Sequence, residues 1–305
     1  MNGKWQHRFV KTNGISMHYV EQGEGFPVLL LHGFPETWFA WQYQIPVLAD
    51  AGFRVIAPDM RGYGETDKPK EIVAYDIHHL VGDMTGLLDA LEIDRAVIIG
   101  HDWGGVVMWM MPIMVPEYVE RVIGINQFLQ PRPDIPPMEV IKKKLGPIRP
   151  IEDYEDRPEN WEYQLYFQKP GRAEADVEAN VGAWVETRMQ SRAVNKDMVP
   201  TASKVYIEAL RKGGIAGPLN YYRNIDRNWH TTSYLKHRRV NKPALMIFAE
   251  NDPVLKPHLA EGMEKLVTNL TSHLISNCGH YGQQEHPDEV NHMILDFLDD
   301  LRNKR

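Results

Sequence analysis

The chain has 305 residues, of which 43% are hydrophobic and 25% are charged, a composition typical of globular domains. Its net charge of −7 argues against non-specific binding to nucleic acid. The single cysteine, Cys278, excludes an intramolecular disulfide, and the opening MNGKWQHRFV lacks the apolar core of a signal peptide. The longest apolar run, residues 106–115, is too short to cross a bilayer and predicts a buried helix instead. We therefore expect a cytoplasmic protein without a membrane span.

Short apolar runs along the chain predict the strands of a sheet. The first residues favour a hairpin, because Asn13 and Gly14 suit its tight turn. The later runs are continuous rather than alternating, which favours buried strands of a parallel sheet covered on both faces. These runs are residues 28–31, 55–58, 96–100, 122–126, 244–248 and 273–276.

Helical patterns separate several of these strands. Residues 77–91 and 290–301 carry apolar side chains at the spacing of an amphipathic helix. Strands that alternate with helices predict an α/β fold with a mostly parallel central sheet flanked by helices. The alternation stops between residues 131 and 235, after the proline-rich QPRPDIPP. We expect residues 1–130 and 236–305 to form the core and residues 131–235 to form an inserted helical cap, with ordinary connecting helices as the alternative.

The sequence GHDWGG places Asp102 between a predicted strand and a predicted helix. Gly100, Gly104 and Gly105 suit a sharp turn that exposes the central side chain, as in the nucleophile elbow of many hydrolases, where a serine is usual. The N-terminus of the following helix favours negative charge, so Asp102 is expected to stay ionised. Taken alone, the pattern fits an aspartate that caps a helix equally well.

An acid and a histidine follow in the loops where such an elbow needs its partners. Asp252 comes after the strand at 244–248, and His280 comes after the strand at 273–276. Both would lie at the same sheet edge as Asp102, in the chain order nucleophile, acid, histidine. Glu250 is an alternative to Asp252.

The sequence HGFPE follows the strand at 28–31, where an oxyanion hole is expected. The backbone N–H groups of Phe34 and Trp103 are its predicted donors. The Phe34-Pro35 bond is expected to be cis, because such prolines favour tight turns. For His32 a structural role in the turn is preferred to a catalytic one.

A carboxylate at the elbow changes the expected reaction. It can attack a saturated carbon without a base and leave an ester, which water activated by His280 can then hydrolyse. A serine would leave an ether that this machinery cannot cleave. Asp102 therefore favours alkyl transfer, and the leaving group is either a halide or the oxygen of an epoxide.

An epoxide oxygen needs a proton or a strong hydrogen-bond donor, and a phenol in an apolar pocket is suited to that role. The predicted cap offers Tyr163 in EYQLYFQ and Tyr222 in GPLNYYRN. The residue pattern by itself does not choose Tyr163 over Tyr154 or Tyr166.

The sequence resembles the epoxide hydrolases of the α/β-hydrolase fold, most of all the hydrolase domain of the mammalian soluble enzymes. HGFPE and GHDWGG also occur in related dehalogenases, whereas YQLYFQKPG together with GPLNYYRN is more specific. The matching stretches, which span nearly the whole chain in order, are HGFPETWFAWQYQIP, PDMRGYGET, GHDWGG, YQLYFQKPG, GPLNYYRN, END and CGH.

The resemblance implies a nucleophile, an orienting acid, a water-activating histidine and two ring-opening tyrosines. These roles fall on Asp102, Asp252, His280, Tyr163 and Tyr222, with oxyanion donors at the backbones of Phe34 and Trp103. An apolar pocket is also implied, and its expected walls are Phe34, Trp103, Phe128, Leu129, Leu255 and Tyr281. Tyr221 and Tyr281 stand where tryptophans are familiar in the family, and residues 139–160 match it poorly.

The expected activity is hydrolysis of an epoxide to a vicinal diol. The expected partners are an apolar epoxide and water, without a metal or organic cofactor, in a monomer or homodimer. A haloalkane or haloacid dehalogenase would share Asp102, Asp252 and His280, but only Trp103 stands out as a halide donor. A ligand-binding protein that kept the pocket and lost turnover is the other alternative.

Overall fold

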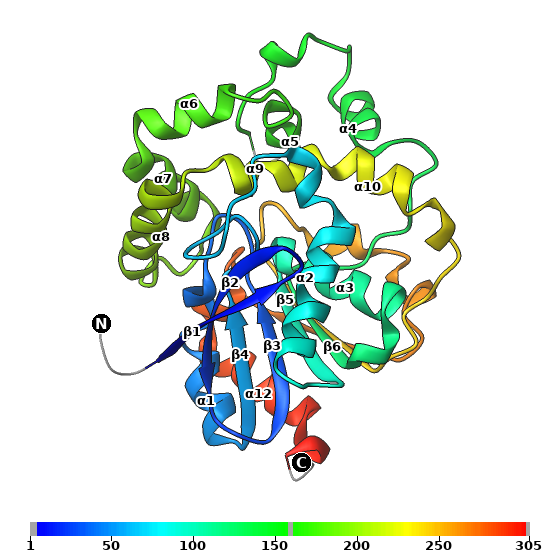
Figure 1. The fold of residues 1–305 in the computed structure, drawn as a ribbon. Helices are drawn as coiled ribbons and strands as arrows, with labels where there is room; N and C mark the ends of the chain where they lie inside the picture. Colours follow the sequence, from blue (N-terminus) through cyan, green and yellow to red (C-terminus); the bar gives the residue numbers. More distant parts are fainter. Residues whose placement is uncertain (1–4, 158–160, 303–305) are drawn as a thin grey trace.

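A single sheet organises the chain, which a computed structural model describes over residues 5–157 and 161–302 (Figure 1). Within these residues the sheet has eight strands in the order β1-β2-β4-β3-β5-β6-β7-β8. Strands β1 and β2 form an antiparallel hairpin, β2 runs antiparallel to β4, and the other pairs are parallel. This confirms the predicted α/β fold. The strands are β1 (Gln6–Thr12), β2 (Ile15–Gln22), β3 (Phe26–Leu31), β4 (Phe53–Pro58), β5 (Ala96–His101), β6 (Val119–Ile125), β7 (Ala244–Ala249) and β8 (Leu270–Ile275).

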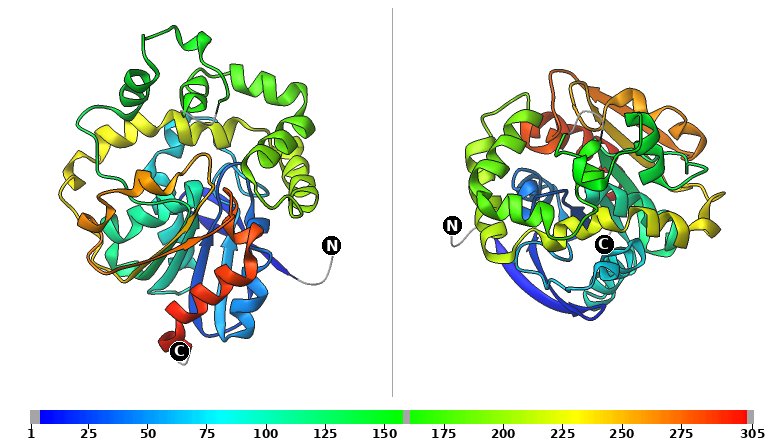
Figure 2. Two further views of the ribbon diagram at one scale, coloured as in Figure 1. Left: turned by 180° about the vertical axis from the view of Figure 1, so that it is seen from behind. Right: turned by 90° about the horizontal axis from the view of Figure 1, so that it is seen from above.

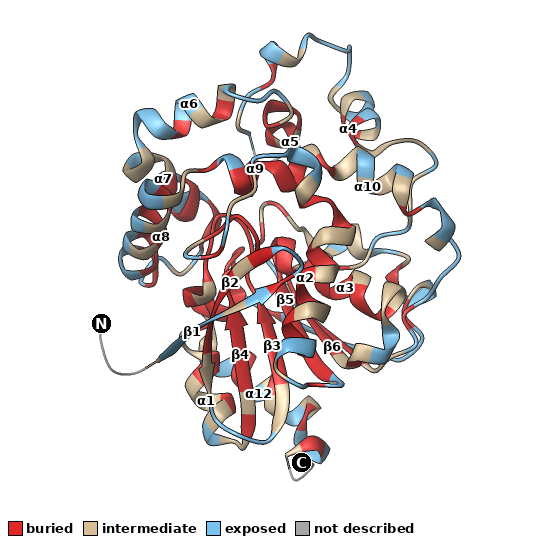
Figure 3. Cartoon of the chain, in the orientation of Figure 1, coloured by how far each residue is buried: buried red, intermediate tan, exposed pale blue. Residues whose placement is uncertain are grey.

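Helices cover both faces of the central strands. Because successive side chains of a strand point to opposite faces, Val28 and Leu30 of β3 join one apolar cluster while Leu29 and Leu31 join another. The first cluster includes side chains of α1 (Gln44–Asp50) and α12 (Pro287–Phe297), and the second includes those of α2 (Ile77–Ala90) and α3 (Asp102–Met114). Figure 2 shows α12 on the face opposite to α2 and α3, and Figure 3 shows the buried strands between them.

Several local predictions are confirmed. Asn13 and Gly14 have φ angles of 44° and 79°, as the tight turn between β1 and β2 requires, and the Phe34-Pro35 bond is cis. The helix predicted at 77–91 is α2, and the one predicted at 290–301 is α12 followed by a 3₁₀ turn at Asp299–Leu301. The apolar run at 106–115 lies within α3 and just after it, with Pro112 inside the helix.

The prediction for the last strand was wrong in one respect. The run at 273–276 was expected to be buried, but β8 starts at Leu270 and its residues 271–274 are exposed, Leu274 by 51%. The reason is that β8 is the edge strand of the sheet, with β7 as its neighbour on one side. A short apolar run does not distinguish a covered strand from an edge strand.

Between β6 and β7 the described residues form helices and no strand. These cap helices gather at one end of the sheet (Figure 1). None of the helices in the described part of the chain is long and apolar enough to cross a membrane. The cap helices are α4 (Pro137–Leu145), α5 (Glu162–Tyr166), α6 (Arg172–Ala179), α7 (Val181–Arg192), α8 (Val199–Gly213), α9 (Ala216–Arg223) and α10 (Ile225–Thr231).

Close packing of α3 on the sheet generates a stability prediction at Gly104. A Cβ atom there would lie 2.1 Å from the carbonyl oxygen of Leu31, whereas a Cβ at Gly182 in α7 would have its nearest neighbour at 3.7 Å. We expect Gly104→Ala to lower the free energy of unfolding by about 1–3 kcal/mol through overpacking. The matched change Gly182→Ala should be neutral or stabilise by up to about 1 kcal/mol. Urea unfolding monitored by circular dichroism measures both, and equal stability of the two variants would contradict the packing argument.

Candidate active site

Asp102 occupies a sharp turn at the junction of β5 and α3. Its φ angle of 48° lies in the left-handed region, which residues other than glycine seldom adopt. The turn is crowded, since a Cβ at Gly33 would lie 2.4 Å from the Cβ of Asp102. The glycine at position 33 therefore allows the loop after β3 to approach the carboxylate.

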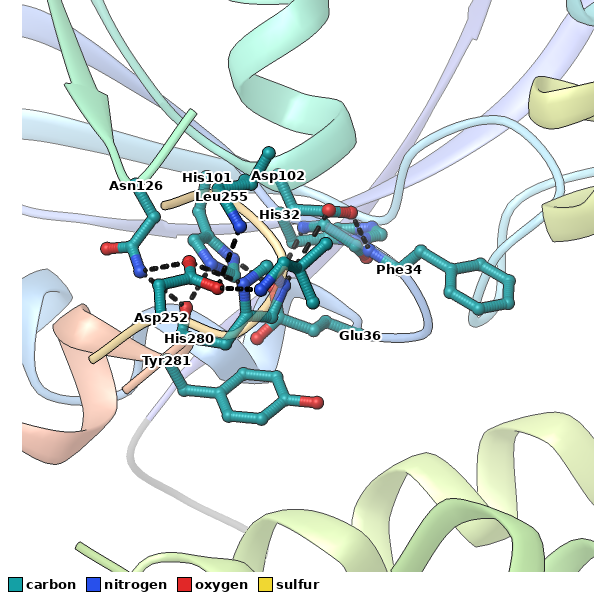
Figure 4. Close-up of polar contacts among 12 residues, drawn as sticks. His32, Phe34, Glu36, His101, Asp102, Asn126, Asp252, Leu255, His280 and Tyr281 are labelled. Atoms are coloured by element: carbon teal, nitrogen blue, oxygen red, sulfur yellow. Dashed lines mark hydrogen bonds and ion pairs between the residues drawn. The ribbon is translucent and has the colours of Figure 1, made fainter. Parts of the chain in front are cut away.

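Backbone N–H groups surround the Asp102 carboxylate on one side. The Phe34 N–H, in the loop after β3, donates to Asp102 Oδ1 at 2.8 Å (Figure 4). Trp103 lies in the first turn of α3, where N–H groups have no acceptor within the helix. Both predicted oxyanion donors thus lie next to Asp102 along the chain or in space.

His280 approaches the carboxylate from the other side. Its Nε2 is 3.7 Å from Asp102 Oδ2, and this nitrogen is buried without a hydrogen-bond partner among the described residues. Its Nδ1 is 2.8 Å from Asp252 Oδ2. The structure thus brings together the three residues expected at this edge of the sheet.

Asp252 is held as a carboxylate by its surroundings. Its Oδ1 accepts the N–H groups of Val254 at 2.7 Å and Leu255 at 2.9 Å, and its Oδ2 accepts from Asn126 Nδ2 at 2.8 Å. Burial alone would raise the pKa of Asp252, but His280 and these donors hold the pKa far below its usual range. Asp252 is therefore an anion facing the His280 ring.

Glu250, the alternative acid, points elsewhere. Its Oε2 accepts the N–H of Asn277 at 2.9 Å, in the loop after β8. The geometry therefore brings Asp252 rather than Glu250 to His280.

Tyr163 of α5 and Tyr222 of α9 pack together beside the nucleophile elbow. Their ring centroids are 5.7 Å apart, and the Tyr222 ring lies 5.1 Å from those of both Phe34 and Trp103. Burial and the negative charge of Asp102 raise the pKa of each phenol, although nearby arginines partly offset the rise. Both side chains therefore keep their protons and can donate hydrogen bonds.

The two other tyrosines that the sequence left open have different surroundings. The Tyr166 hydroxyl donates to Asp176, and the Tyr154 ring lies under the guanidinium of Arg149 at 4.6 Å. Among the described residues, neither ring contacts Trp103 or Tyr222. Tyr163 is therefore the tyrosine of this stretch that lies beside the elbow.

The remaining predicted pocket walls are only partly gathered here. Tyr281 packs against His280 with ring centroids 5.1 Å apart, and Leu255 supports Asp252 through its backbone. Phe128 instead packs near Phe248, and Leu129 lines a separate hollow of about 100 Å³ between α3 and the end of the cap helices. The role of these side chains as walls stays a prediction.

A buried ion pair lies under the elbow. His101 Nδ1 is 2.8 Å from Glu36 Oε2, and His101 Nε2 is 2.7 Å from the carbonyl oxygen of His280. Because both ring nitrogens face acceptors, both must carry a proton. Burial would lower the pKa of His101, but the Glu36 carboxylate overrides it and raises the pKa to about 9. This imidazolium fixes the backbone of His280.

His32 also lies in this region, with a different protonation state. Its Nδ1 donates to the carbonyl oxygen of Gly33 at 2.9 Å, and its Nε2 accepts the N–H of Met60 at 3.0 Å. One donor and one acceptor describe a neutral ring that holds the turn, the role expected for it. Among the described residues, no group of three or more His, Cys, Asp or Glu side chains has an arrangement that could hold a metal ion.

Comparison with known proteins decides the family. Residues 27–287 match the alpha/beta hydrolase fold family. Epoxide hydrolase A of Mycobacterium tuberculosis is 37% identical over 96% of this chain and 97% of its own. The crystal structure of epoxide hydrolase A from Mycobacterium thermoresistibile, 34% identical, has a TM-score of 0.89 and covers 98% of this chain and 99% of that one. The chain belongs to the epoxide hydrolases of the α/β-hydrolase fold.

Longer relatives also belong to this epoxide hydrolase family. Bifunctional epoxide hydrolase 2 of Mus musculus is 41% identical over 96% of this chain but only 55% of its own length. The match to its counterpart in Sus scrofa covers 95% of this chain and 54% of that protein. The chain thus spans about half the length of these curated relatives.

Sequence reasoning missed three polar residues of this epoxide hydrolase site. Asn126 follows β6 with a φ angle of 60°, and its place as the last residue of the predicted strand at 122–126 was the available signal. Glu36 and His101 lie inside HGFPE and GHDWGG, one or two residues from Phe34 and Asp102. Their pairing depends on the approach of two loops, which no local pattern describes.

The buried pair predicts a pH dependence of stability. The folded-state pKa of His101, about 9, exceeds the ordinary histidine value of 6.5. Its stabilisation is therefore complete below pH 6.5 and is lost as the pH rises through about 9. Removing the partner with Glu36→Gln should lower the free energy of unfolding at pH 7 by about 3–5 kcal/mol. It should also remove a decline in stability of up to about 1.4 kcal/mol per pH unit between pH 7 and 9.

Urea unfolding of wild type and variants from pH 6 to pH 10 measures this difference. Glu289→Gln, which changes an exposed carboxylate 3.7 Å from His286, is the matched control and should follow the wild-type profile. If Glu36→Gln and wild type declined equally between pH 7 and 9, the charged pair would not exist as described.

Proposed function

We propose that this protein hydrolyses epoxides to vicinal diols through an ester formed on Asp102. The observation that carries the proposal is the position of the Asp102 carboxylate between the Phe34 N–H and His280, with two protonated phenols packed beside it. The activity named for the full-length mycobacterial relative supports it.

In the first step Asp102 attacks one carbon of the epoxide ring. The carboxylate needs no base for this attack. Tyr163 and Tyr222 hold the epoxide oxygen, and one of them gives its proton to the oxygen as the carbon–oxygen bond breaks. Proton donation of this kind accelerates a reaction by roughly two to four powers of ten. The product is a β-hydroxyalkyl ester of Asp102.

In the second step water cleaves the ester. His280 Nε2, which has no hydrogen-bond partner among the described residues, takes a proton from water, and Asp252 stabilises the imidazolium that results. The hydroxide attacks the Asp102 carbonyl carbon, and the oxyanion is held by the N–H groups of Phe34 and Trp103. Collapse of the tetrahedral intermediate breaks the ester carbon–oxygen bond, and the His280 imidazolium protonates the departing alkoxide to give the diol. The proton left on the Asp102 carboxyl passes to the tyrosine phenolate, which restores the starting state. The steps use protein side chains and water.

The same three residues would serve a dehalogenase, so the tyrosines distinguish the reactions. A halide leaves as an anion and needs N–H donors, whereas a ring oxygen needs a proton. Tyr163 and Tyr222 therefore favour an epoxide. A binding protein without turnover would have no need of the ordered contacts around His280. The cytoplasmic location, the helical cap as a separate domain, and a monomeric or homodimeric state stay predictions.

The ester intermediate is tested by trapping it. His280→Gln should stop the second step, so that incubation with styrene oxide adds the mass of one epoxide to the peptide containing Asp102. His292→Gln changes an exposed histidine and should turn over normally. In wild type, a single turnover in heavy-oxygen water should label the Asp102 carboxylate. Label in the first diol instead would mean that water attacks the epoxide directly.

The tyrosines are tested by the double variant Tyr163→Phe and Tyr222→Phe. We expect its kcat for styrene oxide to fall by about two to four powers of ten, because no proton donor remains. Tyr234→Phe, at a residue 64% exposed, is the control. Near-native turnover by the double variant would remove both tyrosines from the mechanism. Halide release from chloroacetate, measured in the same assay, would favour the dehalogenase.

A further inference from the structure

Two arginines of α7 lie beside the proposed ring-opening tyrosine. Arg188 and Arg192 are one helical turn apart and only 6% and 3% exposed. The guanidinium carbon of Arg192 is 5.5 Å from the Tyr163 ring centroid, and that of Arg188 is 5.6 Å from it and 5.2 Å from the Phe34 ring. Helix α7 thus brings two positive charges against the ring of a tyrosine that is proposed to hold the epoxide oxygen.

The two arginines differ in their ion pairing within the described part of the chain. Arg188 Nη1 donates to both carboxylate oxygens of Asp156, at 3.0 and 2.7 Å. Among the described residues, no carboxylate lies within ion-pair distance of Arg192. Arg188 Nε, Arg188 Nη2 and Arg192 Nε are buried without hydrogen-bond partners in the described part of the chain. Buried charges are normally paired directly, so the Arg192 guanidinium and these donors lack the close partner that such groups usually have.

A hollow of about 360 Å³ connects these groups with the surface of the cap. Arg188 and Arg192 line it together with Asp156 and Asp176. The two acids are already engaged, Asp156 by Arg188 and Asp176 by the Tyr166 hydroxyl. Each acid of the hollow therefore already has a polar partner, whereas Arg192 has none of the acids at ion-pair distance.

The Tyr281 hydroxyl and the Asp102 carboxylate are the next polar groups to consider, on the side of the arginines toward the proposed nucleophile. The Tyr281 hydroxyl is buried without a partner among the described residues, and Figure 4 shows it pointing away from Asp252 and His280. Asp102 is the anion on the inner side. A substrate with a negative charge would be repelled by Asp102, and a cation between the two charges offsets that repulsion.

We propose that the epoxides this protein prefers carry a carboxylate, which Arg192 binds together with the free edge of Arg188. The proposal rests on the proposed function. The Arg192 guanidinium has no ion-pair partner among the described residues, and its planar shape suits the two oxygens of a carboxylate. Because Arg192 lies against the Tyr163 ring, the carboxylate and the epoxide are expected to be separated by few bonds.

The test compares two epoxides that differ at one group. 3-Phenylglycidate carries a carboxylate where trans-β-methylstyrene oxide carries a methyl group. Wild type should prefer the glycidate in kcat/KM. Arg192→Gln should lower kcat/KM for the glycidate by about 10- to 100-fold, mainly through KM, and change the value for the neutral epoxide by less than about threefold. Arg192→Lys should restore part of the preference.

Matched controls separate charge from folding. Arg211→Gln removes an exposed arginine of the neighbouring α8 and should leave both substrates unaffected. The Arg192 carbonyl accepts the His280 N–H at 2.9 Å, and that contact is independent of the side chain. Wild-type preference for the neutral epoxide would overturn the proposal even if Arg192→Gln failed to fold. An equal loss on both substrates would also overturn it and assign Arg192 to the activation of Tyr163.

Binding of 3-phenylpropanoate, which cannot react, separates this proposal from the proposed function. The anion should raise the Tm of wild type and leave that of Arg192→Gln unchanged. If wild type hydrolysed neither epoxide, the proposed function would fail while the Tm shift still reported on the anion site. If both epoxides were hydrolysed and the anion gave no shift, only the anion site would fail.

Discussion

The left-handed backbone of Asp102 is the constraint on which the site depends. At a φ angle of 48°, the chain turns from β5 into α3 so sharply that the carboxylate projects beyond the sheet. The turn fits because Gly33 and Gly104 allow neighbouring backbone to approach where a Cβ would collide. Such conformations are unfavourable on their own and persist where buried surroundings determine them. The buried strands β3, β5 and β6 supply those surroundings. The position of the Asp102 carboxylate therefore depends on the packing of the sheet core.

The parallel sheet explains why groups so far apart in the sequence meet. Loops after β3, β5, β6 and β7 each bring one polar group to the same edge, namely Phe34, Asp102, Asn126 and Asp252. The loop after β8 adds His280. These loops also bind one another, since His101 reaches both Glu36 and the His280 carbonyl. A buried hydrogen-bond network is stable only when each polar group has its partner. A change in one loop therefore removes hydrogen-bond partners from residues in the other loops.

The core strands and the site residues in the loops that follow them were predictable, because both have local signals in the sequence. Apolar runs mark β3 to β7, and Asp102, Asp252 and His280 each come within four residues of the end of such a run. The edge position of β8 was not predictable, because strand order is a property of the whole sheet. Nor were Arg188 and Arg192, since the charged sequence ETRMQSR is typical of a solvated helix face. Their burial follows from how α7 lies against Phe34 and Tyr163, which is a matter of tertiary packing.

The positive charge of Arg192, which has no ion-pair partner among the described residues, is expected to act both on the Tyr163 phenol and on a bound substrate carboxylate. Burial raises the pKa of Tyr163, and Arg192 is the largest influence that lowers it. Burial outweighs this influence, so the pKa of Tyr163 stays above its ordinary value and Arg192 is expected to alter proton donation only slightly. A carboxylate bound to Arg192 would cancel part of this small influence, so the interaction that strengthens binding does not aid proton donation. An interaction that is equally strong in the bound substrate and in the transition state lowers KM but does not speed the chemical step. A preference for anionic epoxides built on Arg192 is therefore expected to appear in KM, whereas kcat is expected to depend on Asp102 and the two phenols.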